Sequence, residues 1–539
     1  MLFCLAPPMK CLSWSLLVLG ALAASSCDRR EVPAPPPTTL YRHLVGDPAT
    51  LDPTTSTEEE ALRVDALLFR PLVGVDKALR PAPALARSWS VSPDGLLYEF
   101  HIDPNATWES GSPVTSDDVR FTIERVRDPK VNATSWSWGF EDLASIETPD
   151  PRTVRVRFAK PYAERLLAFS VPIVSAAAYA RARTPAETDR HPIGSGPYRL
   201  ESWDANQKIR LVRRAEAAPS EAAFAEVVFR VIPDGNTSYR AGAGGELDEF
   251  RVTRDQRKTA EASPDFLARN RLLKVPQPLE VLLVWNCRGP LLADARVRRA
   301  LALAWPRAET ARRLYPPEGA ALVSGPYPPG VAANAPDVAP PAHDPAESAR
   351  LLDAAGWKAG PDGVRRNGGK KASLELLVRA QARTDSNLVE ILRSAYEKVG
   401  VELEAQALDS ALFGQRGQAG EFDGYLTALF FLPPNFDPYP YYHSSQFPPK
   451  GQNIGFYRNP EADRVMEAAR REVDPGKRLE LYRQIHRLLA ADPPADFLWG
   501  ADQYWAISKR VEGVEVSPIG LFHFLPGPLG WRPAPAAPR

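Results

Sequence analysis

Short strand patterns and short helix patterns alternate along most of the chain, and this alternation constrains the fold more than any other feature. Apolar and polar residues alternate in runs of five or six residues, which is typical of strands with one buried face. The clearest runs are Leu97–Ile102, Thr153–Phe158 and Lys208–Val212. Because strands and helices are intermixed and no internal repeat is present, the pattern predicts a mixed α/β fold.

Four helices are predicted from N-terminal caps that are followed by apolar residues at helical spacing. A short polar side chain at the cap accepts a hydrogen bond from an amide that the first turn leaves unpaired. The predicted caps are Thr115, Asp294, Asp344 and Asp474. Residues 322–345 lack such a period and are dense in Pro, Gly and Ala, so they are interpreted as a long surface connection.

The length and charge of the chain restrict its class. With 539 residues, the chain is long enough for two or more packed units with sizeable cores. Basic and acidic residues both number 66, so no overall field favours nucleic acid as a partner. Local pairs such as Arg298 and Arg299 are interpreted as parts of a solvated helix face.

Residues 1–27 have the features of an export signal. Translation is predicted to start at Met9, after which Lys10 and the apolar run LSWSLLVLGALAASS lead to Cys27. This run suits a cleaved signal better than a membrane span of ~20 residues. The segment Ala24–Cys27 resembles a bacterial lipobox with Ala24 in place of the usual leucine. A lipid on Cys27 is therefore predicted as the only membrane contact, with simple secretion as the alternative.

The proline-rich segment after the signal, residues 28–40, is predicted to be a tether between the lipid and the folded body. The cysteines agree with this division, because Cys4 and Cys11 fall in the signal and Cys27 would carry the lipid. Only Cys287 remains in the body, so no internal disulfide can form. The core alone must then stabilise the exported protein.

A series of motifs follows in fixed order from about Leu51 to Gly513. They are LDP at 51–53, FRPLV at 69–73, the stretches Pro81–Ile102, Trp108–Val126 and Ile193–Trp203, GELD at 245–248, ARVRRALALAWPR, DPAESARLLDAAGW, EFD at 421–423, FDP at 436–438, NPEADRVMEAARREVDPGKR and ADPPADF. Together they make the chain similar to the dipeptide- and oligopeptide-binding proteins, the extracellular solute-binding proteins of family 5.

This resemblance implies a two-lobed fold of the periplasmic-binding-protein kind, class II type, whose lobes close on a ligand about a two-strand hinge. Lobe 1 is predicted to comprise residues 41–275 and 500–532, with an inserted subdomain at about 60–190, and lobe 2 residues 276–499. A ligand that gains contacts from both lobes only in the closed state selects that state. The implied role is that of a monomeric receptor in the periplasm or cell envelope. It would deliver a small solute, most simply an oligopeptide, to the permease and ATPase of an ABC importer.

Aromatic residues in loops are candidate ligand contacts, because apolar area supplies affinity while a few polar groups set orientation. Trp136 and Trp138 lie where members of the family place a ligand-facing aromatic; packing between lobes is the alternative. Trp499 stands close to the expected return of the hinge, with core burial as its alternative. Asn286 follows an apolar strand and is predicted either to face the cleft or to cap a turn.

The loop from Phe430 to Gln446 carries further candidates. In peptide-binding relatives an aspartate four residues before the loop's proline binds the peptide's α-amino group, because a carboxylate in a dry cleft pairs strongly with an ammonium. Counting back from Pro438 gives Pro434, so this amine anchor is missing. The aromatic residues could stack on a sugar or line an apolar pocket, and the aspartate is either a structural loop acid or a substitute anchor. The candidates from this loop are Asn435, Asp437, Tyr439 and Tyr442.

Catalytic motifs are missing from the sequence: there is no HExxH, no G-x-S-x-G and no P-loop. The seven histidines are scattered, and His443 beside Asp437 is too little for a metal cage, so no metal site and no cofactor are predicted. Two alternatives stay open for the ligand, an oligosaccharide and a metal chelate. An exported hydrolase and a component of a ligand-sensing receptor are the alternatives from other classes.

Overall fold

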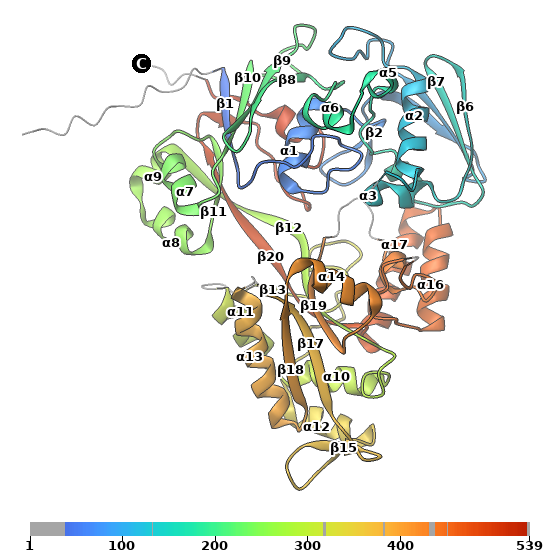
Figure 1. Ribbon diagram of the computed structural model, residues 1–539, viewed down its shortest axis with the longest axis vertical. Helices are drawn as coiled ribbons and strands as arrows, with labels where there is room; N and C mark the ends of the chain where they lie inside the picture. Colours follow the sequence, from blue (N-terminus) through green and yellow to red (C-terminus); the bar gives the residue numbers. More distant parts are fainter. Residues whose placement is uncertain are drawn as a thin grey trace, which may run out of the picture. The chain divides into compact units, whose positions relative to one another are not determined.

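The computed structural model describes residues 38–131, 133–315, 320–380, 383–430, 437–449 and 451–535 (Figure 1). The predicted signal, Cys27 and most of the predicted tether lie outside these residues. The described part combines several β-sheets with many helices, so the predicted mixed α/β fold is confirmed. None of its helices has both the length and the apolar character that crossing a bilayer requires.

The largest sheet has eleven strands in the described residues, in the order β18-β17-β19-β12-β20-β11-β1-β10-β9-β8, with β13 paired to β20. Their bounds are β18 Glu402–Leu408, β17 Ser373–Arg379, β19 Gly424–Phe430, β12 Asn270–Trp285, β20 Ala495–Ser508, β11 Glu249–Val252, β1 Thr39–Leu44, β10 Glu226–Val231, β9 Lys208–Arg213, β8 Tyr198–Asp204 and β13 Ala321–Leu322.

The two long strands β12 and β20 connect the two ends of this sheet. They pair antiparallel from Asn270 opposite Ser508 to Val284 opposite Ala495, with the register shifted between Pro276 and Glu280. One end of β20 also pairs with β11, and the other end of β12 pairs with β19, so these two strands run through both halves (Figure 1). The predicted lobe boundaries, at 275/276 and 499/500, fall inside β12 and β20, and the division at these residues stays a prediction.

A second, four-stranded sheet has the order β4-β5-β7-β6 and is covered by α2 and the short helices around it. Phe100, Phe140, Val154 and Phe169 are buried in its own core. The bounds in this region are α1 Glu59–Leu68, β2 Val73–Val75, β3 Pro81–Pro83, β4 Ala86–Val91, β5 Leu97–Ile102, α2 Ser116–Arg127, α3 Thr134–Ser137, the 3-10 turn Trp138–Phe140, β6 Leu143–Asp150, β7 Thr153–Phe158, α4 Arg165–Ala168, α5 Ala176–Arg181 and α6 Pro185–Arg190.

Helices pack around the strands of the second half of the chain (Figure 1). The remaining bounds are α7 Gly235–Ala243, α8 Arg254–Ala262, α9 Pro264–Arg269, α10 Ala295–Leu303, α11 Arg307–Leu314, α12 Pro345–Ala354, β14 Lys358–Ala359, β15 Arg365–Asn367, β16 Lys370–Lys371, α13 Arg383–Lys398, α14 Ser410–Ala419, α15 Tyr439–Tyr442, α16 Pro460–Arg471, α17 Pro475–Ala491, β21 Val511–Glu512, the 3-10 turn Gly527–Gly530 and β22 Arg532–Pro533.

The elements predicted from local patterns are confirmed. The three predicted strands are β5, β7 and β9, and the four predicted helices are α2, α10, α12 and α17. The carboxylate of Asp344 accepts a hydrogen bond from the amide of Glu347 at 2.9 Å. That of Asp474 accepts one from the amide of Lys477 at 2.8 Å. Both helices therefore begin at the predicted cap, where the side chain satisfies an amide of the first turn.

Two predictions about exposure are wrong. Residues 323–344 form neither helix nor strand, as predicted, but they are not simply a surface connection, since Val323, Tyr327 and Ala335 are buried. The ring of Tyr327 packs 6.0 Å from that of Tyr482 in α17, because this long segment fills space beside the helix. The side chain of Arg298 is only 3% exposed; it pairs with Asp492 and donates to backbone carbonyls, which compensate the burial of its charge.

Two glycines allow the segment before β8 to lie against the end of α1. A Cβ on Gly194 would be 1.9 Å from the carbonyl oxygen of Leu68, and one on Gly196 would be 2.4 Å from that of Leu67. The amide of Gly196 donates to the carbonyl of Leu68 at 2.7 Å. Only glycine permits backbone contacts this close, which explains the IGSGPY motif in structural terms.

Candidate functional site

A buried carboxylate, Asp437, joins two regions that lie far apart in the sequence. It is 4% exposed and directly precedes the turn into α15. The hydroxyl of Tyr162 donates to its Oδ2 at 3.2 Å, and Nε of Arg470 in α16 lies 2.9 Å from the same oxygen. The amide of Tyr439 donates to Oδ1 at 3.0 Å. Tyr162 belongs to the predicted subdomain of lobe 1, whereas Arg470 belongs to predicted lobe 2.

A second carboxylate, Glu164, also connects these two regions, but here the carboxylate lies in the segment 162–164 and its partners lie in α17. Its side chain is 8% exposed and accepts a hydrogen bond from the hydroxyl of Tyr482 in α17 at 3.0 Å. The guanidinium of Arg478 lies 3.7 Å away. Between the two carboxylates, the amide of Ala163 donates to the backbone carbonyl of Arg470 at 2.8 Å. Residues 162–164 are therefore held against α16 and α17 by both side-chain and backbone contacts.

Burial and mutual repulsion shape the charge of this cluster. Burial raises the pKa of Glu164 to about 7, the nearby charge of Asp437 adds to the shift, and Arg478 opposes it. Burial also raises the pKa of Asp437, and the guanidinium of Arg470 opposes that change. Desolvation disfavours the charged form of both carboxylates, whereas the contacts from Tyr482 and Arg478 favour the charged form of Glu164.

Aromatic rings surround these carboxylates. Tyr439 stacks on His443 with the ring centroids 4.0 Å apart, and the guanidinium of Arg470 lies 4.1 Å from the centre of the Tyr439 ring. The ring of Trp138 meets that of Tyr162 edge to face at 6.3 Å. Two of the predicted ligand residues, Trp138 and Tyr439, thus lie beside the polar contacts, and their contact with a ligand stays a prediction.

Trp136 and Tyr442 are held by neighbouring structure. The indole of Trp136 donates to the carbonyl of Pro53 at 3.2 Å and packs against the core of the four-stranded sheet. Tyr442 is 4% exposed and meets Phe497 edge to face at 6.2 Å. Contact of Trp136 and Tyr442 with a bound solute stays a prediction.

Asn286 and Trp499 make the contacts expected of a turn cap and of a core residue, the alternatives to ligand contact. The amide of Asn286 donates to the carbonyls of Gly420 and Phe422 at 3.0 and 2.9 Å. Trp499 is 0% exposed, and its indole donates to the hydroxyl of Tyr315 at 3.0 Å. Turn capping and core packing account for these contacts, and ligand contact by either residue stays a prediction. Asn435 lies outside the described residues.

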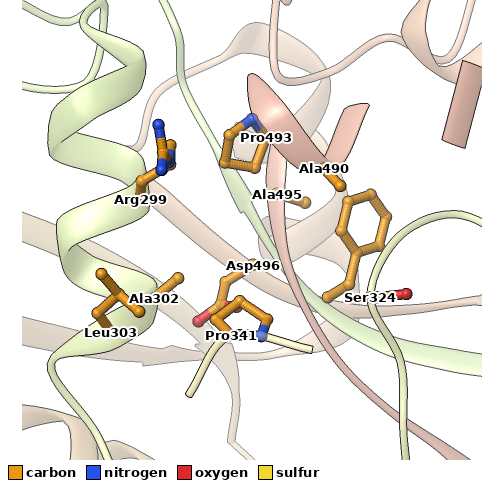
Figure 2. A pocket seen from close by; sticks show the side chains of 10 residues that line it. Arg299, Ala302, Leu303, Ser324, Pro341, Ala490, Pro493, Ala495 and Asp496 are labelled. Atoms are coloured by element: carbon orange, nitrogen blue, oxygen red, sulfur yellow. The ribbon is translucent and has the colours of Figure 1, made fainter. Parts of the chain in front are cut away.

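A separate cavity of about 180 Å³ lies between α10, the end of α17 and β20 (Figure 2). Its lining includes Arg299, Leu303, Pro493 and Asp496, and none of the predicted ligand residues. Typical sites for small molecules enclose about 300–1,000 Å³, so this cavity is too small for an oligopeptide. Within the described residues, no group of three or more His, Cys, Asp or Glu side chains is placed to hold a metal ion.

Sequence analysis missed Tyr162, Glu164, Arg470 and Arg478. Tyr162 and Glu164 follow the end of β7, a position common for site residues, but many loops in this chain follow strands. Arg470 and Arg478 lie within a motif that supports the family resemblance. The many charged residues of that motif are typical of a solvent-exposed helix face, so the sequence does not indicate that these two arginines have buried partners. Nothing in the sequence pairs Tyr162 with Asp437 or Glu164 with Tyr482, which lie 275 and 318 positions apart.

Two long strands that connect the halves of one sheet, with buried polar contacts bridging segments from both halves, define the class of hinged binding proteins. The model of bacterial extracellular solute-binding proteins, family 5, middle region, matches residues 80–451, and the chain belongs to this family. The resemblance drawn from the motifs is therefore confirmed.

Individual relatives agree with this assignment. The oligopeptide-binding protein AppA of Bacillus subtilis (strain 168) is 26% identical over 497 residues, which cover 88% of this chain and 88% of AppA. The structure of AppA in complex with a nonapeptide has a TM-score of 0.73 at 23% identity, covering 92% of this chain and 99% of AppA. The structure of NikZ from Campylobacter jejuni with Ni(L-His) has a TM-score of 0.77 at 24% identity, covering 92% of this chain and 100% of NikZ. These likenesses confirm the two-lobed fold.

Proposed function

We propose that this chain is the solute-capturing receptor of an ABC importer, which encloses a small solute between its predicted lobes and passes it unchanged to the permease and ATPase. The observation that supports this most is the bridge between residues 162–164 and helices α16 and α17, through Asp437 and Glu164. Such contacts stabilise a closed state, and a ligand held by both lobes adds to that stability.

An oligopeptide is the favoured ligand. AppA, similar over most of its length, is named as an oligopeptide-binding protein, and this supports the same class here. NikZ, bound to Ni(L-His), supports a metal chelate as the second candidate. The loss of the amine-binding aspartate at Pro434 means that a peptide would need another anchor for its cationic end.

In this proposal the protein is a monomer and catalyses no reaction. A lipid on Cys27 keeps it at the cell envelope. Membership of an extracellular solute-binding family supports both the export and the binding role. Labelling cells with a radioactive fatty acid tests the anchor: the wild type should incorporate label, and Cys27→Ser should not. Label on the variant would place the lipid elsewhere.

A binding screen tests the proposed function. The full chain is dialysed free of bound solutes and titrated with tripeptides, oligosaccharides and Ni(L-His), with the melting temperature as readout. A ligand at about 100 times its Kd adds about 2.7 kcal/mol of stability, which is easily detected. Stabilisation by peptides, recovered intact by mass spectrometry, supports the proposal. Stabilisation by a sugar alone would overturn the peptide assignment, and turnover of the bound compound would overturn the receptor role.

A further inference from the structure

Glu280 is a buried carboxylate with no partner in the described part of the chain. It lies in β12, directly after the register shift that begins at Pro276, opposite Leu429 of β19 and Gly500 of β20. Its side chain is 0% exposed, and neither Oε1 nor Oε2 has a hydrogen-bond partner among the described residues. It therefore occupies the middle of the two strands that connect the halves of the sheet.

Glu280 lies in the same region as the two bridging carboxylates. Burial raises the pKa of Tyr327, and the charges of Asp437, Glu164 and Glu280 all add to that shift. Burial likewise raises the pKa of Tyr442, with Glu280 the first charge that adds to it. Tyr327, Tyr442 and Tyr482 belong to one buried cluster, and Tyr482 donates to Glu164 at 3.0 Å, so the carboxylates that act on these tyrosines lie around one cluster.

The acidic side chains of this region outnumber the guanidinium groups that pair with them. Asp437 has Arg470 at 2.9 Å and Glu164 has Arg478 at 3.7 Å, whereas no cation of the described residues lies near Glu280. Three acidic side chains thus share two guanidinium groups, and Glu280 is the one without such a partner among the described residues. Two further buried polar atoms here, Oε2 of Glu164 and the hydroxyl of Tyr442, also have no hydrogen-bond partner in the described structure.

An unpaired buried carboxylate is costly for the folded protein. Burial disfavours the charged form, so the pKa of Glu280 lies well above its usual value and the empty protein holds the group as the neutral acid, with both oxygens unpartnered in the described structure. An apolar residue at this position of a buried strand would avoid the cost of burying a polar group without hydrogen-bond partners. A counter-charge from outside the chain would explain why a carboxylate stands here.

We propose that Glu280 binds the cationic group of the captured solute, an ammonium or a guanidinium, inside the closed protein. This inference rests on the proposed receptor function and specifies its ligand class. A cation stabilises the ionised form of Glu280 and supplies hydrogen-bond donors to both of its oxygens. It also gives a peptide an amine partner although Pro434 replaces the aspartate that binds the amine in peptide-binding relatives.

Binding of small probes tests this role. The full chain, dialysed free of solutes, is titrated calorimetrically with Ala-Ala-Ala, its N-acetyl form, N-acetyl-Ala-Lys-Ala and spermidine. Wild type should bind a probe that carries an ammonium at least tenfold more tightly than N-acetyl-Ala-Ala-Ala. Glu280→Gln should lose at least tenfold in affinity for that probe, the scale of one charge-assisted hydrogen bond. Glu402→Gln removes an exposed carboxylate of β18 and should leave the affinity unchanged.

The stability of the empty protein gives a second readout. Because Glu280 has no partner to lose, Glu280→Gln should leave the melting temperature unchanged or raise it. Glu249 is equally buried but bound by Arg42 and Arg63, so Glu249→Gln should lower the melting temperature. A merely structural role of Glu280 would instead make both variants less stable.

The outcomes separate this inference from the proposed function. Equal binding of neutral and cationic peptides by wild type and Glu280→Gln would overturn the role of Glu280 and leave the peptide receptor intact. Tight, Glu280-dependent binding of spermidine alone would support the role of Glu280 and overturn the peptide assignment. Binding of none of the four probes, or a clear loss of stability in Glu280→Gln, would overturn the role of Glu280.

Discussion

Glu164 makes the stability of the protein depend on pH at the contact between residues 162–164 and the helices of predicted lobe 2. It faces Tyr482 and Arg478 from α17, Arg470 from α16 and the carboxylate of Asp437. Its pKa is raised from 4.5 to about 7, so the folded state holds a proton that the unfolded state releases above pH 4.5. By linkage, its contribution to stability is greatest below pH 4.5 and is lost as the pH rises towards 7.

Glu164→Gln should remove this dependence on pH. Relative to the wild type, the variant should gain stability between pH 5 and pH 8, by up to on the order of 3 kcal/mol, because a neutral amide has no charge to desolvate. Urea unfolding of both proteins at several pH values measures the difference. A difference that stays constant with pH would show that Glu164 does not titrate in this window.

The pair Asp437 and Arg470 should show strong energetic coupling. Arg470→Met leaves the buried carboxylate without this guanidinium and should cost about 3 kcal/mol of unfolding free energy. This is the lower end for buried pairs, since the side chain of Arg470 is 26% exposed. Asp437→Asn combined with Arg470→Met should recover much of the loss. A double-mutant cycle by urea unfolding measures the coupling, and additive losses would contradict it.

Single residues were the hardest to predict from the sequence. Arg298 and Arg470 both lie in helices whose many charged residues predict exposure to solvent. In the structure each arginine instead pairs with an aspartate from another part of the chain. Glu280 stands in an apolar strand run without any local signal for its burial among tyrosines. Each depends on residues at great sequence separation, and spacing along one segment carries no information about those neighbours.

Elements were predictable because their causes are local. The alternation in β5 and β7 and the caps of α12 and α17 depend on residues within a few positions of each other. The 323–344 segment shows the limit of this approach. Its composition correctly predicts the lack of helix and strand, but the burial of Tyr327 depends on α17, which lies about 150 residues further along.

The close contact between α1 and the IGSGPY segment yields a test at this scale. Gly196→Ala places a methyl group against the carbonyl of Leu67, which cannot move without disturbing α1. The variant should lose about 2 kcal/mol or more, in the range of overpacked sites. Gly46→Ala is the matched control, because nothing lies within 4 Å of its added Cβ. Thermal or urea unfolding compares them, and equal stabilities would show that the segment adjusts freely.

At the scale of the whole molecule, the motifs predicted the family and the two-lobed fold, both of which are confirmed. The proposed ligand site could be predicted only in part. The motifs directed attention to the 430–446 loop and its Asp437, which proves to be buried and bonded to Tyr162. The contacts of α16 and α17 and the burial of Glu280 became evident only in the folded chain, because segments from both halves contribute to the proposed site.

The central claim is that the molecule closes on a solute and returns it unaltered. Small-angle X-ray scattering of the full chain, with and without saturating Ala-Lys-Ala, followed by mass spectrometry of the recovered peptide, tests it most directly. We expect a smaller radius of gyration with the peptide and complete recovery of the intact tripeptide. An unchanged scattering curve at saturation, or a cleaved peptide, would contradict the account.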